Sequence, residues 1–230
     1  MSKEGSMSIK KVAALVPMRH HSQRVPGKNY RSFNGKPLFY HILQALEGVA
    51  GIQTIAVDTD SPLIKEKVKS DFPAVQIIDR PTHLQADDIP MNEILMYDTG
   101  LVPADLYLQT HSTNPLLTSD TLARALDKFI SVYPAYDSLF SVTRIQSRLW
   151  DSLARPINHN PAILLQTQDL PPVYEENSCF YLFTRDTLSH HHTRIGNRPY
   201  LFEINKTEAW DIDEEEDFEI AELLSKKKHK

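Results

Sequence analysis

Five short apolar runs, separated by segments of helical periodicity, constrain the fold of this chain more than any other feature. Runs of four or five residues read as strands with both faces covered, as in a parallel sheet. The runs are Val12–Val16, Gln53–Val57, Val75–Ile78, Asp105–Gln109 and Leu139–Thr143. Because strand and helix patterns alternate along the chain, we predict an α/β fold with a mostly parallel sheet covered by helices on both faces.

Helix signals lie between these runs, either as capping residues or as prolines suited to a first helical position. Two further strands are expected later in the chain, at Ser178–Phe183 and Tyr200–Ile204. We expect helices to begin at Pro37, at Pro62 (capped by Ser61), at Met91 and at Thr118 or Ser119.

The alternation of strands and helices stops after Thr143. Residues 144–177 are rich in Arg, Pro, Asn and Gln and show no sustained period, and a structureless loop of that length is uncommon inside a compact domain. We interpret the chain as one domain (1–230) with a core over 10–143, an arm over 144–177 and a return to the core over 178–226. The arm carries apolar residues that need a covering surface, such as a second subunit: Ile145, Leu149, Trp150, Ile163 and Leu164.

The composition narrows the class of protein. The net charge of −5 argues against a general nucleic-acid binder, and no apolar stretch approaches the roughly 20 residues of a membrane span. The first ten residues lack the apolar core of a signal peptide and read as a short disordered lead, as do the last five. With Cys179 as the one cysteine, an intrachain disulfide is impossible, and we expect a cytoplasmic protein that binds neither nucleic acid nor membrane.

A cationic loop follows the first apolar run. Arg19, Arg24 and Lys28 lie in it, and no Asp or Glu occurs between Met18 and Lys36. Open α/β sheets bind ligands beyond the carboxyl ends of their strands, and guanidinium and ammonium groups match phosphate oxygens. No Gly-rich phosphate motif is present, so side chains would have to hold a polyphosphate. Basic side chains in a loop are also commonly only solvated, and that alternative stays open.

An acidic segment near the other end complements this loop. Trp210–Glu219 holds seven acids, and the two-residue spacing of Asp211 and Asp213 points both carboxylates the same way in an extended chain. Two such ligands suit Mg²⁺, which takes one or two carboxylates together with substrate phosphates. Asp213 followed by Glu216 is also a helix capping pattern, and the two interpretations are compatible. A cationic loop and an acidic pair together indicate a nucleoside triphosphate with Mg²⁺.

Several motifs in order resemble those of the acylneuraminate cytidylyltransferases. The resemblance covers roughly residues 10–224, and although no one motif is decisive, the motifs in this order are a strong signal together. The motifs are VPMRHHSQRVPGKN, AVDTDS, DRP, THSTNPLLT, QDLPPVYEENSCFY and DIDEEEDF.

The resemblance implies a three-layer α/β/α Rossmann-like nucleotidyltransferase fold, a homodimer formed through the arm, and Mg²⁺ as cofactor. It implies a reaction in which CTP and a 2-keto-3-deoxy sugar acid of the nonulosonic type give the CMP-sugar and pyrophosphate. Positioning and charge neutralisation would dominate the chemistry. The matching positions are Arg19, Ser22, Arg24 and Lys28 for phosphates, Asn29 and Arg80 for ribose and base, Asp211 and Asp213 for the metal, and Gln109, His111, Tyr174 and Asn177 for the sugar; Arg19, Lys28, Asp211 and Asp213 would be catalytic.

Four departures from the family pattern are informative. Gln23 replaces a lysine, which leaves Arg24 to supply the charge, and Ser178 replaces a glycine. Thr167 replaces an arginine, so that carboxylate recognition would fall to another residue such as Arg144 or Arg148. The family glutamine falls on Gln109 or on His111, depending on a gap. These changes suggest a branch with its own sugar, such as a pseudaminic- or legionaminic-like acid.

Two other functions remain open at this point. One is a GT-A-like glycosyltransferase, in which an Asp pair also holds a metal, although the cationic loop favours a triphosphate substrate. The other is a degenerate nucleotide-binding protein, for which Gln23 and Thr167 are the best support.

Overall fold

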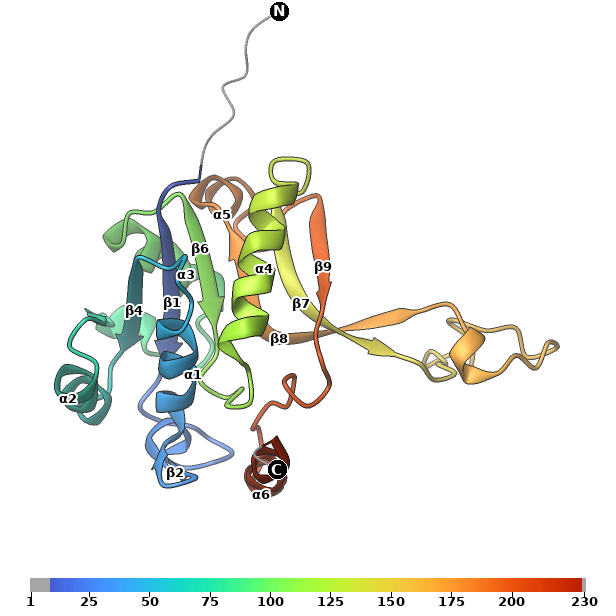
Figure 1. The fold of residues 1–230 in the computed structure, drawn as a ribbon, viewed down its shortest axis with the longest axis horizontal. Coiled ribbons are helices and arrows are strands. Elements are labelled where there is room, and N and C mark those ends of the chain that lie inside the picture. The colour runs from blue at the N-terminus through green and yellow to red at the C-terminus, as the bar shows by residue number, and fades with distance from the viewer. Residues whose placement is uncertain (1–8, 229–230) are drawn as a thin grey trace, which may run out of the picture.

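A computed structural model of the protein describes residues 9–228 as a seven-stranded sheet with helices packed on both faces (Figure 1). The predicted three-layer α/β/α fold is confirmed. The strands of this sheet are β1 (Val12–Met18), β4 (Thr54–Thr59), β5 (Gln76–Asp79), β6 (Leu106–Thr110), β7 (Ser138–Ile145), β8 (Val173–Phe183) and β9 (Pro199–Glu203). The helices are α1 (Leu38–Glu47), α2 (Pro62–Asp71), α3 (Met91–Leu101), α4 (Ser119–Val132), α5 (Arg185–His191) and α6 (Glu215–Lys228). Shorter elements are the strands β2 (Ser32–Phe33) and β3 (Lys36–Pro37) and the 3-10 turns η1 (Lys28–Tyr30), η2 (Thr82–Leu84) and η3 (Thr167–Asp169).

The sheet has the order β5-β4-β1-β6-β8-β7-β9. β1 pairs in parallel with both β4 and β6, and β8 alone runs against its neighbours, so the sheet is mostly parallel as predicted. The carboxyl ends of β1, β4, β5 and β6 therefore meet at one edge. Ligands of open α/β sheets bind at such an edge.

Alternation along β1 explains the two helical layers. Ala14 and Val16 pack in a cluster with side chains of α1, α2 and α4, whereas Ala13 and Leu15 pack with side chains of α3 and α5. Every residue of β1 is buried, which agrees with the uninterrupted apolar run in the sequence.

The expected helix starts hold with small corrections. Ser61 caps α2 through Ile64 N–H, and Thr118, rather than Ser119, caps α4 through Thr121 N–H. Pro37 precedes α1 as its cap residue instead of opening it. The prediction missed α5, and it placed the start of β8 five residues late, because the first half of that strand lies outside the core and lacks an apolar pattern.

A third apolar cluster joins the two ends of the chain. Val25 and Phe33, from the segment after β1, pack with Ile212 and with Phe218 of α6. Ile212 is fully buried, as its place between two aspartates predicted, and its N–H donates to Thr113 O over 2.9 Å. This cluster holds the acidic segment against the cationic loop.

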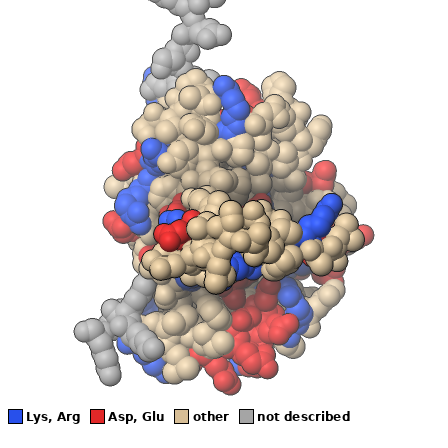
Figure 2. Space-filling view, turned by 90° about the vertical axis from the view of Figure 1, so that its right-hand side faces the viewer, with Lys and Arg blue, Asp and Glu red and all other residues tan. Residues whose placement is uncertain are grey.

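The arm is a two-stranded ribbon that leaves the core and ends in an irregular tip (Figure 1). Pairing of β7 with β8 continues out to Ile145 and Val173, so the base of the predicted arm is regular antiparallel sheet. Figure 2 shows the arm end-on as a surface with few charged groups. The arm exposes large apolar side chains, namely Trp150, Leu153, Ile157, Ile163, Leu164, Leu165 and Tyr174.

Within residues 9–228, none of the helices is both long enough and apolar enough to cross a membrane. The predicted disordered lead over the first ten residues lies largely outside the described residues, since 1–8 are not part of them. The prediction for the last five residues is wrong at 226–228, which continue α6, while 229–230 lie outside the described residues.

Candidate active site

A cavity of about 450 Å³ opens at the carboxyl edge of the sheet. Its walls come from the loop after β1, from Arg80 after β5 and from His111–Thr113 after β6, with the acidic segment on a further side. Five cationic side chains and two carboxylates line it, so the cavity favours an anionic ligand. The cations are Arg19, Arg24, Lys28, Arg80 and Arg194, and the carboxylates are Asp211 and Asp213.

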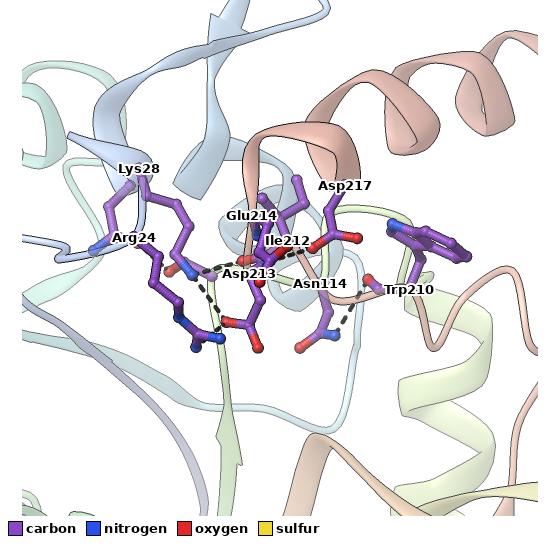
Figure 3. Close-up of polar contacts among 10 residues, drawn as sticks. Arg24, Lys28, Asn114, Trp210, Ile212, Asp213, Glu214 and Asp217 are labelled. Atoms are coloured by element: carbon purple, nitrogen blue, oxygen red, sulfur yellow. Dashed lines mark hydrogen bonds and ion pairs between the residues drawn. The ribbon is translucent and has the colours of Figure 1, made fainter. Parts of the chain in front are cut away.

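Lys28 and Arg24 connect the loop to the acidic segment. The Lys28 ammonium donates to Ile212 O over 2.6 Å and lies 3.4 Å from Asp213 Oδ1, and the Arg24 guanidinium donates to the same oxygen over 2.7 Å. Figure 3 shows both side chains pointing at Asp213. Both exposed partners, Arg24 and Asp213, can separate at little cost when a phosphate competes.

Asn29 fixes the shape of the loop. Its side-chain amide donates to Arg19 O over 2.8 Å and accepts from the Ser112 hydroxyl over 2.7 Å. Gly27 supplies the left-handed conformation, with φ of 68°, that starts the turn into Lys28. Asn29 lines the cavity as predicted, but in this arrangement its polar atoms hold the loop.

Asp211 and Asp213 have different surroundings. Burial, followed by the nearby charge of Asp213, raises the pKa of Asp211, and Asp211 Oδ1 is buried without a hydrogen-bond partner. Asp213 is half-exposed and forms ion pairs with Arg24 and Lys28 of the loop. The predicted helix cap by Asp213 is not formed. Instead, the Asp217 carboxylate accepts from the N–H groups of Asp213 (2.9 Å) and Glu214 (2.8 Å). The Asp213 side chain is therefore free to turn to the cavity (Figure 3).

The residues present fit a hard divalent cation. Asp211 Oδ1 is an unpartnered carboxylate oxygen at the cavity wall, and Asp213 offers a second one. Among the described residues, no group of three or more acidic, His or Cys side chains is placed to hold a metal by itself. A cation at this pair would therefore need further oxygens from a ligand phosphate or water, which is the preference of Mg²⁺.

Arg80 is held by buried acids. Its Nε donates to Asp58, both side chains are almost inaccessible, and Asp98 of α3 lies beside them. One cation faces two carboxyl groups, and burial together with the charge of Asp58 raises the pKa of Asp98 to about 9. Asp98 is therefore protonated at neutral pH, and the network holds Arg80 in the cavity wall.

His111 and Gln109, the two candidates for the family glutamine, lie in contact with each other. The Gln109 amide nitrogen lies 3.1 Å from His111 Nε2 and also donates to Thr110 O. His111 lines the cavity, whereas Gln109 is fully buried behind it and accepts from Arg194 over 2.5 Å. Burial, and then the charges of Arg194 and Lys28, lower the pKa of His111 to about 3, so its ring is neutral.

The other sugar-site candidates lie elsewhere. Asn177 accepts from Ser141 (2.6 Å) and donates to Thr143 (2.9 Å), and thus holds an irregularity in the β7–β8 pairing rather than facing the cavity. Tyr174 projects from the arm, outside the cavity of its own chain. Ser178 does line the cavity with φ of 58°, so it keeps the left-handed conformation for which the family uses glycine.

The structure thus gathers most predicted nucleotide and metal residues around one cavity. Sequence analysis missed Asp58, Asp98 and Arg194. Arg194 lies in the loop before β9, at the amino end of a strand that runs parallel to β7. Ligands of open α/β sheets bind beyond the carboxyl ends of the strands, so the sequence did not predict a ligand contact for this loop. Its long side chain reaches the cavity across the Tyr181 ring, which no local pattern reveals.

The fold and the cavity define an α/β protein that binds an anionic ligand at the carboxyl edge of its sheet. Residues 13–229 match the cytidylyltransferase family, and the chain therefore belongs to that family. The resemblance to cytidylyltransferases noted in the sequence is confirmed at this level.

Individual relatives are distant but cover most of the chain. The chain is 25% identical to a pseudaminic acid cytidylyltransferase of Campylobacter jejuni over 94% of its own length and 96% of that protein. It is 26% identical to N-acylneuraminate cytidylyltransferase A of Danio rerio over 92% of its own length and 50% of that protein. A solved structure of CMP:2-keto-3-deoxy-manno-octonic acid synthetase complexed with CTP superposes with a TM-score of 0.71 at 17% identity, covering 95% of this chain and 99% of that one. At that identity the structural likeness shows the fold alone.

The Asp98 network predicts a pH-dependent stability. The folded-state pKa of about 9 lies above the ordinary value of 3.8, so the stabilisation from protonated Asp98 is complete below pH 3.8 and is lost as pH rises toward 9. Asp98→Asn removes this loss, and its thermal stability relative to wild type should increase between pH 5 and pH 8.5. The gain should be at most about 1.4 kcal/mol per pH unit, or roughly 3–6 °C.

Differential scanning calorimetry across this pH range measures the effect. Asp127→Asn, which removes an exposed carboxylate of α4, is the matched control and should follow the wild-type profile. If the difference in melting temperature between Asp98→Asn and wild type stays constant with pH, Asp98 is ionised in the folded protein.

Proposed function

We propose that this protein transfers CMP from CTP to a nonulosonic-type sugar acid and releases pyrophosphate. The observation that carries the proposal is the contact of the cationic loop with the acidic pair across one cavity, in a chain of the cytidylyltransferase family. The loop supplies charge for a triphosphate, and the acidic pair supplies carboxylates for its counter-cation.

The chemistry is an in-line displacement at phosphorus. The anomeric hydroxyl oxygen of the sugar acid bonds to the α-phosphorus and its proton passes to water. The bond from the α-phosphorus to the bridging oxygen of the β-phosphate breaks, and pyrophosphate leaves with the electron pair. Lys28 and Arg19 would stabilise negative charge on the phosphates as it shifts toward the leaving group. Ser22 and Arg24 would hold further phosphate oxygens, and Arg80 would contact the nucleoside from its fixed position.

Asp211 and Asp213 would hold Mg²⁺. When bound, this ion would neutralise phosphate charge. The buried Asp211 would position the ion, because its free oxygen lacks a partner in the protein. Asp213 would exchange its contacts with Arg24 and Lys28 for contacts with the ion.

The sugar acid belongs to the same broad class as the substrates named for the relatives. Those names include pseudaminic acid, N-acylneuraminate and 3-deoxy-manno-octulosonate. The departures at Gln23, Thr167 and Ser178 favour a pseudaminic- or legionaminic-like acid over the commonest sialic acid.

The arm would form a homodimer. Its exposed apolar side chains and its projection from the core are those of a segment that packs on a partner. In such a dimer, Tyr174 of the arm would help to close the neighbour's sugar pocket.

A pyrophosphate-release assay tests the function. We expect activity with CTP and at least one acid from a panel of N-acetylneuraminate, pseudaminate, legionaminate and 2-keto-3-deoxy-manno-octonate. Lys28→Ala should lower kcat at saturating CTP by roughly 100-fold and affect CTP binding less, because charge shifts in the transition state. Turnover within twofold of wild type would remove Lys28 from the chemistry, and CTP-independent or absent turnover would reject the function.

The acidic pair predicts a separate metal phenotype. Asp211→Asn should lower activity by roughly 100-fold or more and raise the Mg²⁺ concentration needed for half-maximal rate, because one metal ligand is lost. Its melting temperature should not fall, since the amide replaces a buried and partly unpartnered carboxylate. Glu214→Gln, which changes an exposed neighbour, is the control and should retain the wild-type Mg²⁺ dependence.

The arm predicts a dimer in solution. Trp150→Ala should weaken dimerisation by roughly tenfold or more and raise the KM for the sugar acid more than that for CTP, because a large interface side chain is lost. Sedimentation velocity over a concentration series measures the first effect. Leu63→Ala removes an apolar group of similar exposure on α2 and should leave both quantities unchanged. An active wild-type monomer would contradict the role of the arm.

A further inference from the structure

We propose that Arg194 binds the carboxylate of the acceptor sugar acid. This inference rests on the proposed function and assigns a specificity-determining residue within it. The observation behind it is a cation in the cavity wall that forms no ion pair with any Asp or Glu of residues 9–228.

The other cavity cations differ from Arg194 in this respect. Each of them has a carboxylate partner in the structure, so its charge is compensated before any ligand arrives. The pairs are Arg19 with Asp87, Arg24 and Lys28 with Asp213, and Arg80 with Asp58. A half-buried guanidinium without a carboxylate is costly, and an anionic ligand removes that cost.

Neighbouring groups hold the Arg194 side chain in place. Its guanidinium carbon lies 3.5 Å from the centroid of the Tyr181 ring, and Nη1 donates to Gln109 Oε1 over 2.5 Å. The Tyr181 hydroxyl in turn donates to Glu176, which keeps that carboxylate on the tyrosine. The Tyr181 side chain also takes part in a hydrogen bond with Arg194, and no Asp or Glu of residues 9–228 forms an ion pair with this guanidinium on the cavity wall.

Burial is the largest influence on the charge of Arg194. It lowers the pKa of Arg194, whereas the Tyr181 side chain and the charge of Glu176 act in the opposite direction. Burial and the charges of Arg194 and Lys28 lower the pKa of the neighbouring His111, so that ring is neutral. Met91 and Ile94 add apolar surface to the lining of the same cavity. A carboxylate approaching this wall would meet a preoriented guanidinium.

A carboxylate fits this position better than a nucleotide phosphate. Phosphate-binding charges are concentrated on the loop after β1, whereas Arg194 is tied to Gln109 at the end of β6 and to Tyr181 of β8. The arginine that the family places before Q-x-L-P is Thr167 here, in the arm and outside the cavity lining. Arg148 of the arm donates to Leu165 O, so it does not serve the cavity of its own chain either.

The experiment varies both the enzyme and the carboxyl group. Initial rates are measured for wild type, Arg194→Gln and Arg194→Lys with the best acid of the panel and with its C1 amide. Wild type should prefer the acid by about 100-fold in kcat/KM, because the amide leaves the guanidinium without an anion. Arg194→Gln should raise the KM for the acid by about 100-fold, leave the KM for CTP within threefold, and remove most of the preference for the acid. Arg194→Lys should keep part of the preference for the acid, since lysine retains the positive charge but lacks the planar guanidinium.

Arg198→Gln, in the same loop, is the matched control and should behave as wild type. The wild-type comparison of acid and amide requires no variant to fold, and equal rates with both would overturn the proposal. An unchanged preference in Arg194→Gln, or a rise in the KM for CTP alone, would also overturn it while leaving the cytidylyltransferase function intact.

Absence of turnover with every acid would reject the proposed function instead. Arg194 is then judged by binding of the panel acids, measured by saturation-transfer NMR in the presence of CTP. Weaker binding to Arg194→Gln than to wild type would support the assignment. Equal binding, or no binding to wild type, would reject it.

Discussion

The site depends on the burial of Ile212. This side chain packs with Val25, Phe33 and Phe218, and its N–H is fixed by Thr113 O, so the residues on either side of it are held at the cavity. Full burial of an Ile side chain is worth about 1.5–3 kcal/mol. That energy joins two segments separated by most of the chain, because Lys28 then reaches Ile212 O and Asp213. The contact between the cationic loop and the acidic pair is thus a consequence of apolar packing.

Charge compensation follows from that packing. Asp213 forms ion pairs with Arg24 and Lys28. Glu215 forms an ion pair with Arg31, whose guanidinium also lies 4.5 Å from the centre of the Phe218 ring. These pairs keep a strongly cationic loop folded without a ligand. The pairs of Arg24 and Arg31 are exposed and therefore weak, so a triphosphate with its counter-cation can replace the Arg24–Asp213 contact without a large penalty.

Features of the fold and the site could be predicted from the sequence only where neighbouring residues in the chain carry the pattern. The run Val12–Val16 predicted a buried strand, and the burial of Ile212 followed from its place between two aspartates, because side-chain period and apolarity are properties of neighbouring residues. The partners of Arg80 could not be predicted in this way. Asp58 and Asp98 come from β4 and α3, and only the tertiary fold brings them to one arginine. The contacts of Asn177 could not be predicted for a similar reason, since its partners Ser141 and Thr143 lie on another strand.

Arg80 and Arg194 show two ways in which the fold prepares a cation for a ligand. Arg80 is bound by Asp58 beside the protonated Asp98, so its position is fixed and its charge is largely satisfied by the protein. Arg194 is fixed by an aromatic ring and an amide oxygen, which orient it without neutralising it. A satisfied cation can orient a polar nucleoside, whereas an oriented but uncompensated cation selects for an anion. Under the proposed function, the two arginines on one cavity would therefore divide recognition between the nucleotide and the sugar acid.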